Sequence, residues 1–280
     1  MTFDDARHNR GGCPATPVSC RRILSRCGIP GYEYSLNPYR GCLHACAYCY
    51  ASFLERFRAQ PRPWGSFLEA KENAPEALAR ELPRARPGRI FLSSVTDPYQ
   101  PAEGACRITR GLLEVLADAP AGFSLTVLTK GELVLGDAAL LRQLGARVGL
   151  TLTCPRDADA RRVEPGAVPT SRRLAVLGEL GAVGVATWAF LGPLLPGLYD
   201  AGGGLAWLLE ELARAGVRQV TADCLNPYPR SVARLRVALS GRARAALEEA
   251  LREPAAYRER LRRELAAAAA GRDLSLSCAF

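Results

Sequence analysis

Between residues 89 and 225 the sequence alternates between short apolar segments and longer amphipathic segments, with only a few residues between them. Five apolar segments have the pattern of buried β-strands: 90–95, 124–129, 148–153, 183–191 and 219–225. Four segments have the apolar spacing of α-helices: 108–117, 137–144, 170–180 and 205–215. Such an alternation is typical of a parallel sheet with helices packed against it. The sequence therefore predicts an α/β fold.

A sixth strand is expected at residues 32–37, and short helices at 51–59 and 75–82. Six strand–helix units are too few for a closed eight-unit barrel, so we expect a partial (β/α)6 TIM-type barrel over residues 32–230. Residues 1–31 are rich in Gly, Pro, Cys and Arg and are expected to form an irregular N-terminal arm. Residues 231–280 are rich in Ala, Arg and Glu and are expected to form a helical C-terminal extension.

The composition is that of a globular protein, since 48% of the 280 residues are hydrophobic and 23% are charged. No apolar run reaches the ~18 residues that a membrane span requires. The N-terminus is acidic and polar, whereas a secretory signal peptide is basic and then apolar. We therefore expect a cytoplasmic protein with no membrane partner.

The net charge of +9 comes from 37 basic and 28 acidic residues. A basic surface suits a polyanionic partner such as DNA or RNA. Lys71 and Lys130 are the only lysines, however, and Ala, Gly and Pro are abundant. Codon bias in a GC-rich genome explains such an arginine-rich composition equally well, so charge alone leaves the partner open.

Ten cysteines are many for a chain expected in a reducing compartment, and they indicate metal binding or redox chemistry. Cys42, Cys46 and Cys49 follow the spacing C-x3-C-x2-C. A loop with this spacing can hold one face of a four-iron cluster through three thiolates, which leaves one iron open to a ligand. A zinc site with His44 as fourth ligand, or accidental clustering, is the alternative. In the cluster reading, His44 is expected to face solvent or to pack within the loop.

This motif resembles the signature of the radical S-adenosylmethionine (SAM) superfamily, in which an aromatic residue usually precedes the third cysteine, as Tyr48 does here. The longer pattern Gly-Cys-x3-Cys-x-Tyr-Cys-Tyr is similar to the spore photoproduct lyase branch. Further segments similar to that branch and to its relatives of unassigned activity lie at 29–35, 37–42, 93–101 and 164–166. The resemblance extends over about residues 20–225.

The resemblance implies that Cys42, Cys46 and Cys49 hold a [4Fe–4S] cluster and that SAM binds its open iron. One electron would then cleave SAM to methionine and a 5′-deoxyadenosyl radical, which abstracts hydrogen from the substrate. The task of the protein is to position the substrate carbon and to exclude water. The resemblance also implies a one-electron reductant such as flavodoxin or ferredoxin as a partner.

Other candidate residues lie where the predicted strands end, because chemistry in such barrels gathers at the C-terminal rim. The resemblance implies a contact between Lys130 and SAM, and a cation there can pair with the SAM carboxylate. Asp97 and Tyr99 are candidates for a substrate contact or a hydrogen relay, although Tyr99 can equally be an exposed loop residue. Further cofactor-binding candidates, whose hydroxyls also suit caps and turns, are Tyr48, Ser94, Thr96, Thr151, Thr153 and Asn226.

One departure from the lyase pattern bears on the reaction. The lyases carry a hydrogen-donating cysteine near the end of the second strand, where this sequence has Ser93-Ser94-Val95-Thr96-Asp97. A serine O–H bond is too strong to replace a thiol as a hydrogen-atom donor. Three functions therefore stay open: a radical SAM enzyme acting on nucleic acid, one acting on a small molecule, peptide or protein, and a cluster-binding redox or electron-transfer protein without SAM chemistry.

The other cysteines leave a second site open. Cys13, Cys20 and Cys27 recur every seven residues. They can feed a second cluster or, with Cys278, clamp the two termini, but three unrelated thiols give the same spacing. Two more, at the ends of predicted strands, can face the site or the core: Cys154 and Cys224.

Overall fold

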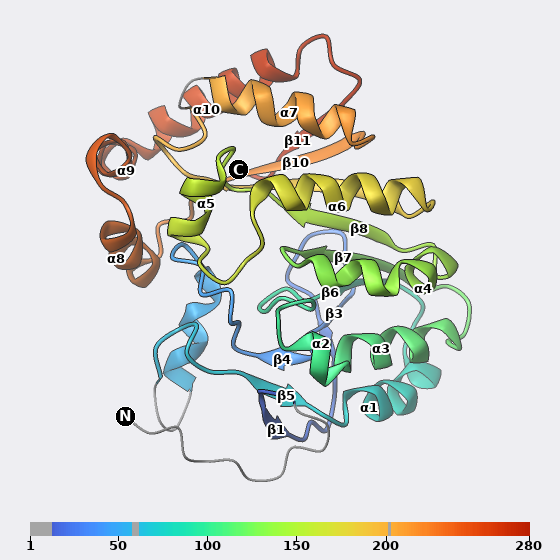
Figure 1. Cartoon of the computed structure of the whole chain (residues 1–280). Helices are drawn as coiled ribbons and strands as arrows, with labels where there is room; N and C mark the ends of the chain where they lie inside the picture. The colour runs from blue at the N-terminus through green and yellow to red at the C-terminus, as the bar shows by residue number, and fades with distance from the viewer. Residues whose placement is uncertain (1–12, 58–61, 201–202) are drawn as a thin grey trace.

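A computed structural model describes residues 13–57, 62–200 and 203–280 (Figure 1). Its centre is an eight-stranded sheet in the order β11-β10-β9-β8-β7-β6-β3-β2. Seven of these strands run parallel, and six of them follow the six predicted segments: β3 (Tyr34–Leu36), β6 (Arg89–Leu92), β7 (Ser124–Thr129), β8 (Arg147–Thr151), β9 (Ala186–Leu194) and β10 (Gln219–Cys224). Within the described residues the sheet stays open between β2 and β11, so the partial barrel is confirmed.

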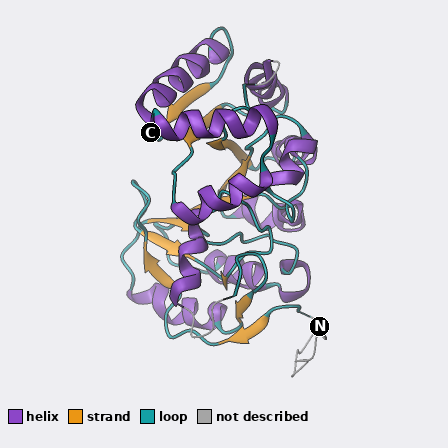
Figure 2. Ribbon diagram, turned by 90° about the vertical axis from the view of Figure 1, so that its left-hand side faces the viewer, coloured by secondary structure: helices purple, strands orange, loops and turns teal. Residues whose placement is uncertain are grey.

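The parallel strands form because their side chains are buried on both faces. Along β7, Leu125, Thr126 and Val127 are all buried in sequence, as expected for a strand covered on both sides. Helices lie side by side along one face of the sheet: α1 (Ala74–Glu81), α3 (Ile108–Ala117), α4 (Ala138–Gln143), α6 (Thr170–Ala182) and α7 (Gly204–Arg214). The side view shows the strands passing through the centre of the molecule with helices outside them (Figure 2).

Several short elements were not predicted. The helix expected at 137–144 is preceded by the 3-10 helix η3 (Glu132–Asp137). A second 3-10 turn, η2 (Leu82–Arg84), follows α1. Two short helices lie in loops that the apolar pattern left blank: α2 (Glu103–Cys106) and α5 (Asp157–Val163).

The N-terminal arm is more regular than its composition indicates. Within its described part, β1 (Thr16–Val18) and β2 (Leu24–Arg26) are strands, whereas residues 1–12 lie outside the described residues. β2 pairs antiparallel with β3, and β1 joins β5 (Glu69–Lys71) and β4 (Tyr39–Arg40) in a small sheet of order β1-β5-β4. The helix expected at 51–59 is the 3-10 helix η1 (Tyr50–Phe57), and residues 58–59 lie outside the described residues.

The C-terminal extension is helical over α8 (Pro229–Ala238), α9 (Gly241–Arg252) and α10 (Pro254–Ala269), but it does not end as a helix. Its last element is β11 (Ser275–Cys278), which pairs in parallel with β10 and adds a strand to the main sheet. The strand is mostly exposed and lacks an apolar pattern, which explains why it was missed. None of the described helices is long and apolar enough to cross a membrane.

The cysteines outside the central motif do not gather. Cys13 forms a disulfide with Cys106, so it is not a ligand for a second cluster as long as that bond persists. Cys20, Cys27 and Cys278 are free. β2 and β11 form the two edges of the main sheet, and among the described residues no disulfide joins Cys278 to the N-terminal arm.

Candidate active site

The three motif cysteines lie in a loop between β4 and η1, which we call the cluster loop (residues 41–49). The loop begins at Gly41, whose φ of +87° falls in the left-handed region that favours glycine. A Cβ on Gly41 would also lie 2.4 Å from the Phe67 carbonyl oxygen. The Thr96 hydroxyl donates to the Gly41 carbonyl over 2.6 Å, and the Leu43 amide donates to the Gln100 side chain over 2.9 Å. The segment after β6 therefore fixes the first turn of the loop.

The segment after α5 holds the middle of the cluster loop. The Ala47 amide donates to the Val163 carbonyl over 2.8 Å, and the Gly166 amide donates to the His44 carbonyl over 3.1 Å. A Cβ on Gly166 would lie 2.2 Å from the Leu43 carbonyl oxygen, so only glycine permits this approach. Residues 164–166, which carried part of the family resemblance, thus act as a support for the loop.

A residue of α8 holds the end of the cluster loop. The Arg234 guanidinium donates to the carbonyls of Ala47 and Cys49 over 3.1 and 3.0 Å, and to the Ser52 hydroxyl over 2.9 Å. Arg234 lies 185 residues along the chain from Cys49, so no local sequence pattern could have revealed this contact.

Cys42, Cys46 and Cys49 line one cavity at the C-terminal ends of the parallel strands. All three are free thiols. Most of the other predicted site residues line the same cavity: Tyr48, Ser94, Thr96, Asp97, Lys130, Thr151 and Asn226. These residues come from the ends of β6, β7, β8 and β10, as expected for a barrel of parallel strands.

Two predicted residues lie outside the cavity lining. Tyr99 is 2% exposed, not an exposed loop residue, and its hydroxyl donates to Asp137 over 3.0 Å within the core. Thr153 is fully buried, and its hydroxyl donates to Glu164 over 3.0 Å. Neither side chain is placed to touch a ligand in this cavity.

Cys42 and Cys46 are buried and Cys49 is half-buried, and backbone amides donate to the sulfurs of Cys42 and Cys49. Burial raises the pKa of Cys42 well above its usual value, raises that of Cys46 to about 12, and raises that of Cys49. The His44 amide faces the Cys42 sulfur, and the amides of Ala51 and Ser52 face the Cys49 sulfur. Amide donors to sulfur are a feature of iron–sulfur sites, where they tune the potential.

Lys130 places a positive charge beside these thiols. Burial alone lowers the pKa of Lys130, but the charges of Cys46 and Glu164 outweigh burial and keep the pKa above its usual value. Its ammonium nitrogen lies 5.7 Å from the centre of the Tyr48 ring, within the range of a cation–π contact. Lys130 is therefore a cation at neutral pH, at the cavity wall.

Beneath Tyr48 lies a buried charge network. The Tyr48 hydroxyl donates to Glu164, which also forms an ion pair with Arg173, and both charged side chains are fully buried. Burial alone raises the pKa of Glu164, but Arg173 and Lys130 outweigh burial and lower it. The network fixes Tyr48, the residue before the third cysteine, and sequence reasoning gave no signal for it.

Asp97 and His44 form a second buried pair at the cavity wall. The His44 Nδ1 atom lies 3.4 Å from Asp97 Oδ2, and His44 is 2% exposed, so it does not face solvent. Asp97 also accepts hydrogen bonds from the Thr129 hydroxyl and the Lys130 amide. Burial alone raises the pKa of Asp97, but His44 and these donors outweigh burial and hold the pKa at about 2. Asp97 is thus an anion that joins the cluster loop to β7.

Ser93 is a cavity residue that sequence reasoning did not select. Its φ of +70° is strained for a residue other than glycine. Its hydroxyl is buried without a hydrogen-bond partner in the described part of the chain, and the side chain lines the cavity. Buried polar atoms normally have a hydrogen-bond partner, so this hydroxyl is free to bond a group bound in the cavity. The cavity wall also includes apolar side chains that were not predicted: Trp64, Phe190 and Leu225.

The residues present fit an iron–sulfur cluster with an organic ligand. Three free thiols, two of them with backbone amide donors, share the cavity with a cation and an unpaired hydroxyl. No three His, Cys, Asp or Glu side chains in the described ranges gather as ligands of a single metal ion. His44 faces Asp97, which leaves the zinc alternative without support from the geometry.

Comparisons with known proteins agree with this site. The family model of the radical SAM superfamily matches residues 36–202. The chain belongs to the radical SAM superfamily. Members of this superfamily are enzymes that use SAM at a [4Fe–4S] cluster, and these cofactors are implied for this chain. The match includes the cluster loop and the ends of β6, β7 and β8.

Related sequences and solved structures resemble this chain over most of its length. It is 33% identical to an uncharacterised protein of Methanocaldococcus jannaschii over 65% of this chain and 68% of that protein. It is 32% identical to an uncharacterised protein of Mycobacterium tuberculosis over 89% of this chain and 78% of that protein. Spore photoproduct lyase bound to dinucleoside spore photoproduct has a TM-score of 0.65 at 15% identity, over 94% of this chain and 81% of the lyase. At this identity the likeness to the lyase concerns the fold.

Proposed function

We propose that this protein is a radical SAM enzyme of the spore photoproduct lyase type, with a [4Fe–4S] cluster held by Cys42, Cys46 and Cys49. The observation that carries the proposal is the shared cavity, where three free thiols face Lys130 and the unpaired Ser93 hydroxyl. Cluster and SAM, when bound there, supply a 5′-deoxyadenosyl radical by one-electron cleavage of SAM, and the radical takes hydrogen from the substrate.

The cavity residues have separate roles in this proposal. Lys130 pairs with the SAM carboxylate, and Tyr48 with Glu164 below it holds that cation in place. The Ser93 hydroxyl, which has no partner among the described residues, donates a hydrogen bond to SAM or to the substrate. Thr151 and Asn226 offer polar groups from the far strands. Trp64 and Phe190, among others, supply an apolar wall that excludes water.

For the substrate we propose a nucleic acid, with an acidic one-electron carrier such as flavodoxin or ferredoxin as reductant. The fold neighbour with a bound dinucleoside and the basic net charge support this class. A small molecule or peptide is the second candidate, because Ser93 and Ser94 stand where the lyases carry a hydrogen-donating cysteine. The cytoplasmic location and the domain boundaries at residues 31 and 230 stay predictions.

The test is anaerobic reconstitution followed by reduction with dithionite and assay of 5′-deoxyadenosine from SAM. We expect the wild-type protein to bind about four irons per chain and to produce 5′-deoxyadenosine. The Cys46→Ala variant should produce none. Cys278→Ala, which removes an exposed free thiol on β11, serves as the matched control and should behave as wild type. A reconstituted protein that binds no SAM would refute the proposal and leave a cluster-binding redox protein.

The substrate classes separate in a second experiment. SAM cleavage is measured with and without DNA or RNA oligonucleotides over a range of salt concentrations. Stimulation that falls steeply with salt supports a nucleic acid, since phosphate contacts release counterions. Stimulation by peptides or small molecules alone would favour the second candidate.

A further inference from the structure

The cluster loop has a second side, away from the cavity, that the proposed chemistry does not use. There Cys46 and Tyr48 share an apolar cluster with residues of α5, α8 and α9, among them Val163, Leu235 and Leu247. None of these three helices contributes to the lining of the cavity. SAM and substrate require the cavity, so a protein that delivers electrons has to approach from another side.

Arg234 connects this second side to solvent. Its guanidinium contacts the Cys49 carbonyl at 3.0 Å, while its side chain is 28% exposed. Only the Arg234 side chain therefore lies between the Cys49 backbone and a protein bound at the surface over Arg234. Such a short path suits electron transfer without opening the cavity.

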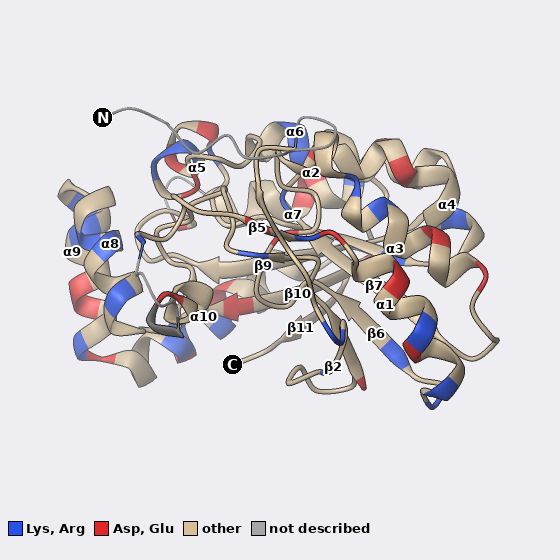
Figure 3. Cartoon of the chain, turned by 90° about the horizontal axis from the view of Figure 1, so that it is seen from below, with Lys and Arg blue, Asp and Glu red and all other residues tan. Residues whose placement is uncertain are grey.

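The helices around Arg234 carry an excess of positive charge. Together α5, α8 and α9 contain eight arginines and four acidic residues, whereas the whole chain has 37 basic and 28 acidic residues. Two glutamates each serve two of these arginines: Glu248 pairs with Arg236 and Arg244, and Glu55 of η1 pairs with Arg230 and Arg234. The face therefore keeps an excess of positive charge. Viewed from below, the ribbons of α5, α8 and α9 carry several blue positions, which mark basic residues, with red acidic positions among them (Figure 3).

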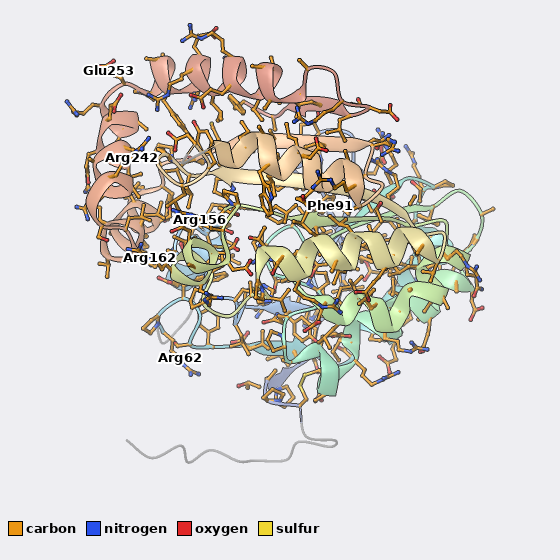
Figure 4. All side chains as sticks on the ribbon, turned by 45° about the horizontal axis from the view of Figure 1, so that its top comes forward. Arg62, Phe91, Arg156, Arg162, Arg242 and Glu253 are labelled. Atoms are coloured by element: carbon orange, nitrogen blue, oxygen red, sulfur yellow. A yellow bond between two sulfur atoms is a disulfide. The ribbon has the colours of Figure 1, made fainter. Side chains whose placement is uncertain are left out.

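Part of this charge is exposed and not held in an ion pair. Arg161 and Arg242 are exposed and form no ion pair or hydrogen bond with a described residue, although the charge of Arg161 helps to lower the pKa of Asp157 on the same helix. Arg162, at the end of α5, donates to the Ser240 hydroxyl over 2.8 Å, which ties α5 to the start of α9. Figure 4 shows Arg156, Arg162 and Arg242 on the same side of the molecule. Unpaired arginines on one face favour an acidic partner.

We propose that the face formed by α5, α8 and α9 docks an acidic one-electron carrier protein. The proposal rests on the function proposed above, in which the enzyme needs one electron for each SAM cleaved. The carrier gives one electron to the cluster and leaves oxidised by one electron, and no proton or atom is transferred. A nucleic acid is also a polyanion, but its reacting carbon must enter the cavity. The face formed by α5, α8 and α9 lies on the opposite side of the cluster loop from the cavity, so it suits the carrier better than the nucleic acid.

The test reverses the two unpaired charges in R161E/R242E. These residues lie outside the cavity and do not touch the cluster loop. The matched control, R80E/R142E, makes the same change in net charge on α1 and α4 at the other end of the sheet, on two exposed arginines without ion pairs to described residues. The probes are a purified bacterial flavodoxin and a purified bacterial ferredoxin, both acidic.

We expect R161E/R242E to weaken binding of at least one carrier about tenfold or more at low salt, and the difference to shrink at high salt. Cluster reduction by that carrier, followed by stopped-flow absorbance, slows accordingly. Reduction by dithionite and the resulting 5′-deoxyadenosine stay at wild-type levels in both variants, so the proposed function is checked separately in the same proteins.

Three results would overturn the docking proposal. Equal losses in R161E/R242E and R80E/R142E would indicate a general charge effect. If R161E/R242E binds both carriers as tightly as the wild-type protein does, this face is not the docking site. Loss of affinity for a DNA duplex with carrier binding retained would assign the face to nucleic acid.

Discussion

Substitution of Gly166 by alanine tests how the cluster loop is held. The new Cβ would lie 2.2 Å from the Leu43 carbonyl oxygen and 2.9 Å from the His44 Cα atom, and both are backbone atoms that no rotamer change can move. Relief requires a shift of about 1 Å between two packed segments, and such overpacking costs about 1–3 kcal/mol. The shift also weakens the 3.1 Å hydrogen bond from Gly166 to His44 and the 2.8 Å bond from Ala47 to Val163.

Each weakened hydrogen bond contributes about 1 kcal/mol, so we expect Gly166→Ala to lower the free energy of unfolding by about 2–4 kcal/mol. Urea denaturation of the apo-protein measures this loss. The iron content after anaerobic reconstitution should fall as well, because the shift moves the backbone around the thiols. Gly178→Ala is the matched control, since no atom lies within 4 Å of its added Cβ, and in helix α6 it should stabilise by about 0.5–1 kcal/mol. Unchanged stability and iron content in Gly166→Ala would refute the steric argument.

Three further predictions concern charged groups. Burial raises the pKa of Glu103 to about 7, above its unfolded value, so its neutral form stabilises the fold at low pH and that stability is lost as pH rises through about 7. Urea titrations of the wild type should show a loss of about 3 kcal/mol in the free energy of unfolding between pH 4.5 and 8. This loss should disappear in Glu103→Gln, and the same pH dependence in the variant would contradict the prediction. Glu164→Gln leaves the fully buried Arg173 without its charged partner and should cost about 3–5 kcal/mol of stability, partly recovered in Glu164→Gln/Arg173→Met; no loss would show that the pair is not formed. Lys130→Met should weaken SAM binding about 10–100-fold in equilibrium dialysis, the effect of one charge-assisted hydrogen bond, with iron content unchanged; wild-type affinity would remove Lys130 from the site.

The main strands were predictable because burial on both faces leaves a strong local pattern. β7 was found to the residue, since Leu125, Val127 and their neighbours form one apolar run. β11 was not found, because its side chains lie mostly in solvent and its position depends on β10. β1 and β2 are short and mostly exposed, so they leave no apolar pattern. Local pattern therefore identified the covered part of the sheet and failed at its edges.

The site was predictable where spacing or position carries the chemistry. The thiols follow from the cysteine spacing, and Lys130 and Asp97 follow from their place at strand ends. Ser93 was missed because its strained backbone and unpaired hydroxyl exist only in the folded chain. Tyr99 was predicted either to act at the site or to be an exposed loop residue, and nothing in the sequence indicated its buried hydrogen bond to Asp137, which holds it in the core.

The geometry of the three thiols depends on the whole chain, and this bears on the predicted boundary at residue 230. The cluster loop has no helix or strand of its own, so its backbone polar groups need partners from elsewhere. Those partners are Gln100, Val163, Gly166 and Arg234, which come from three separate parts of the sequence. Arg234 and the apolar residues of α8 and α9 lie beyond residue 230, yet they pack directly against the loop. The predicted boundary follows a change in sequence pattern, while the helices beyond it support the cluster loop from outside the cavity.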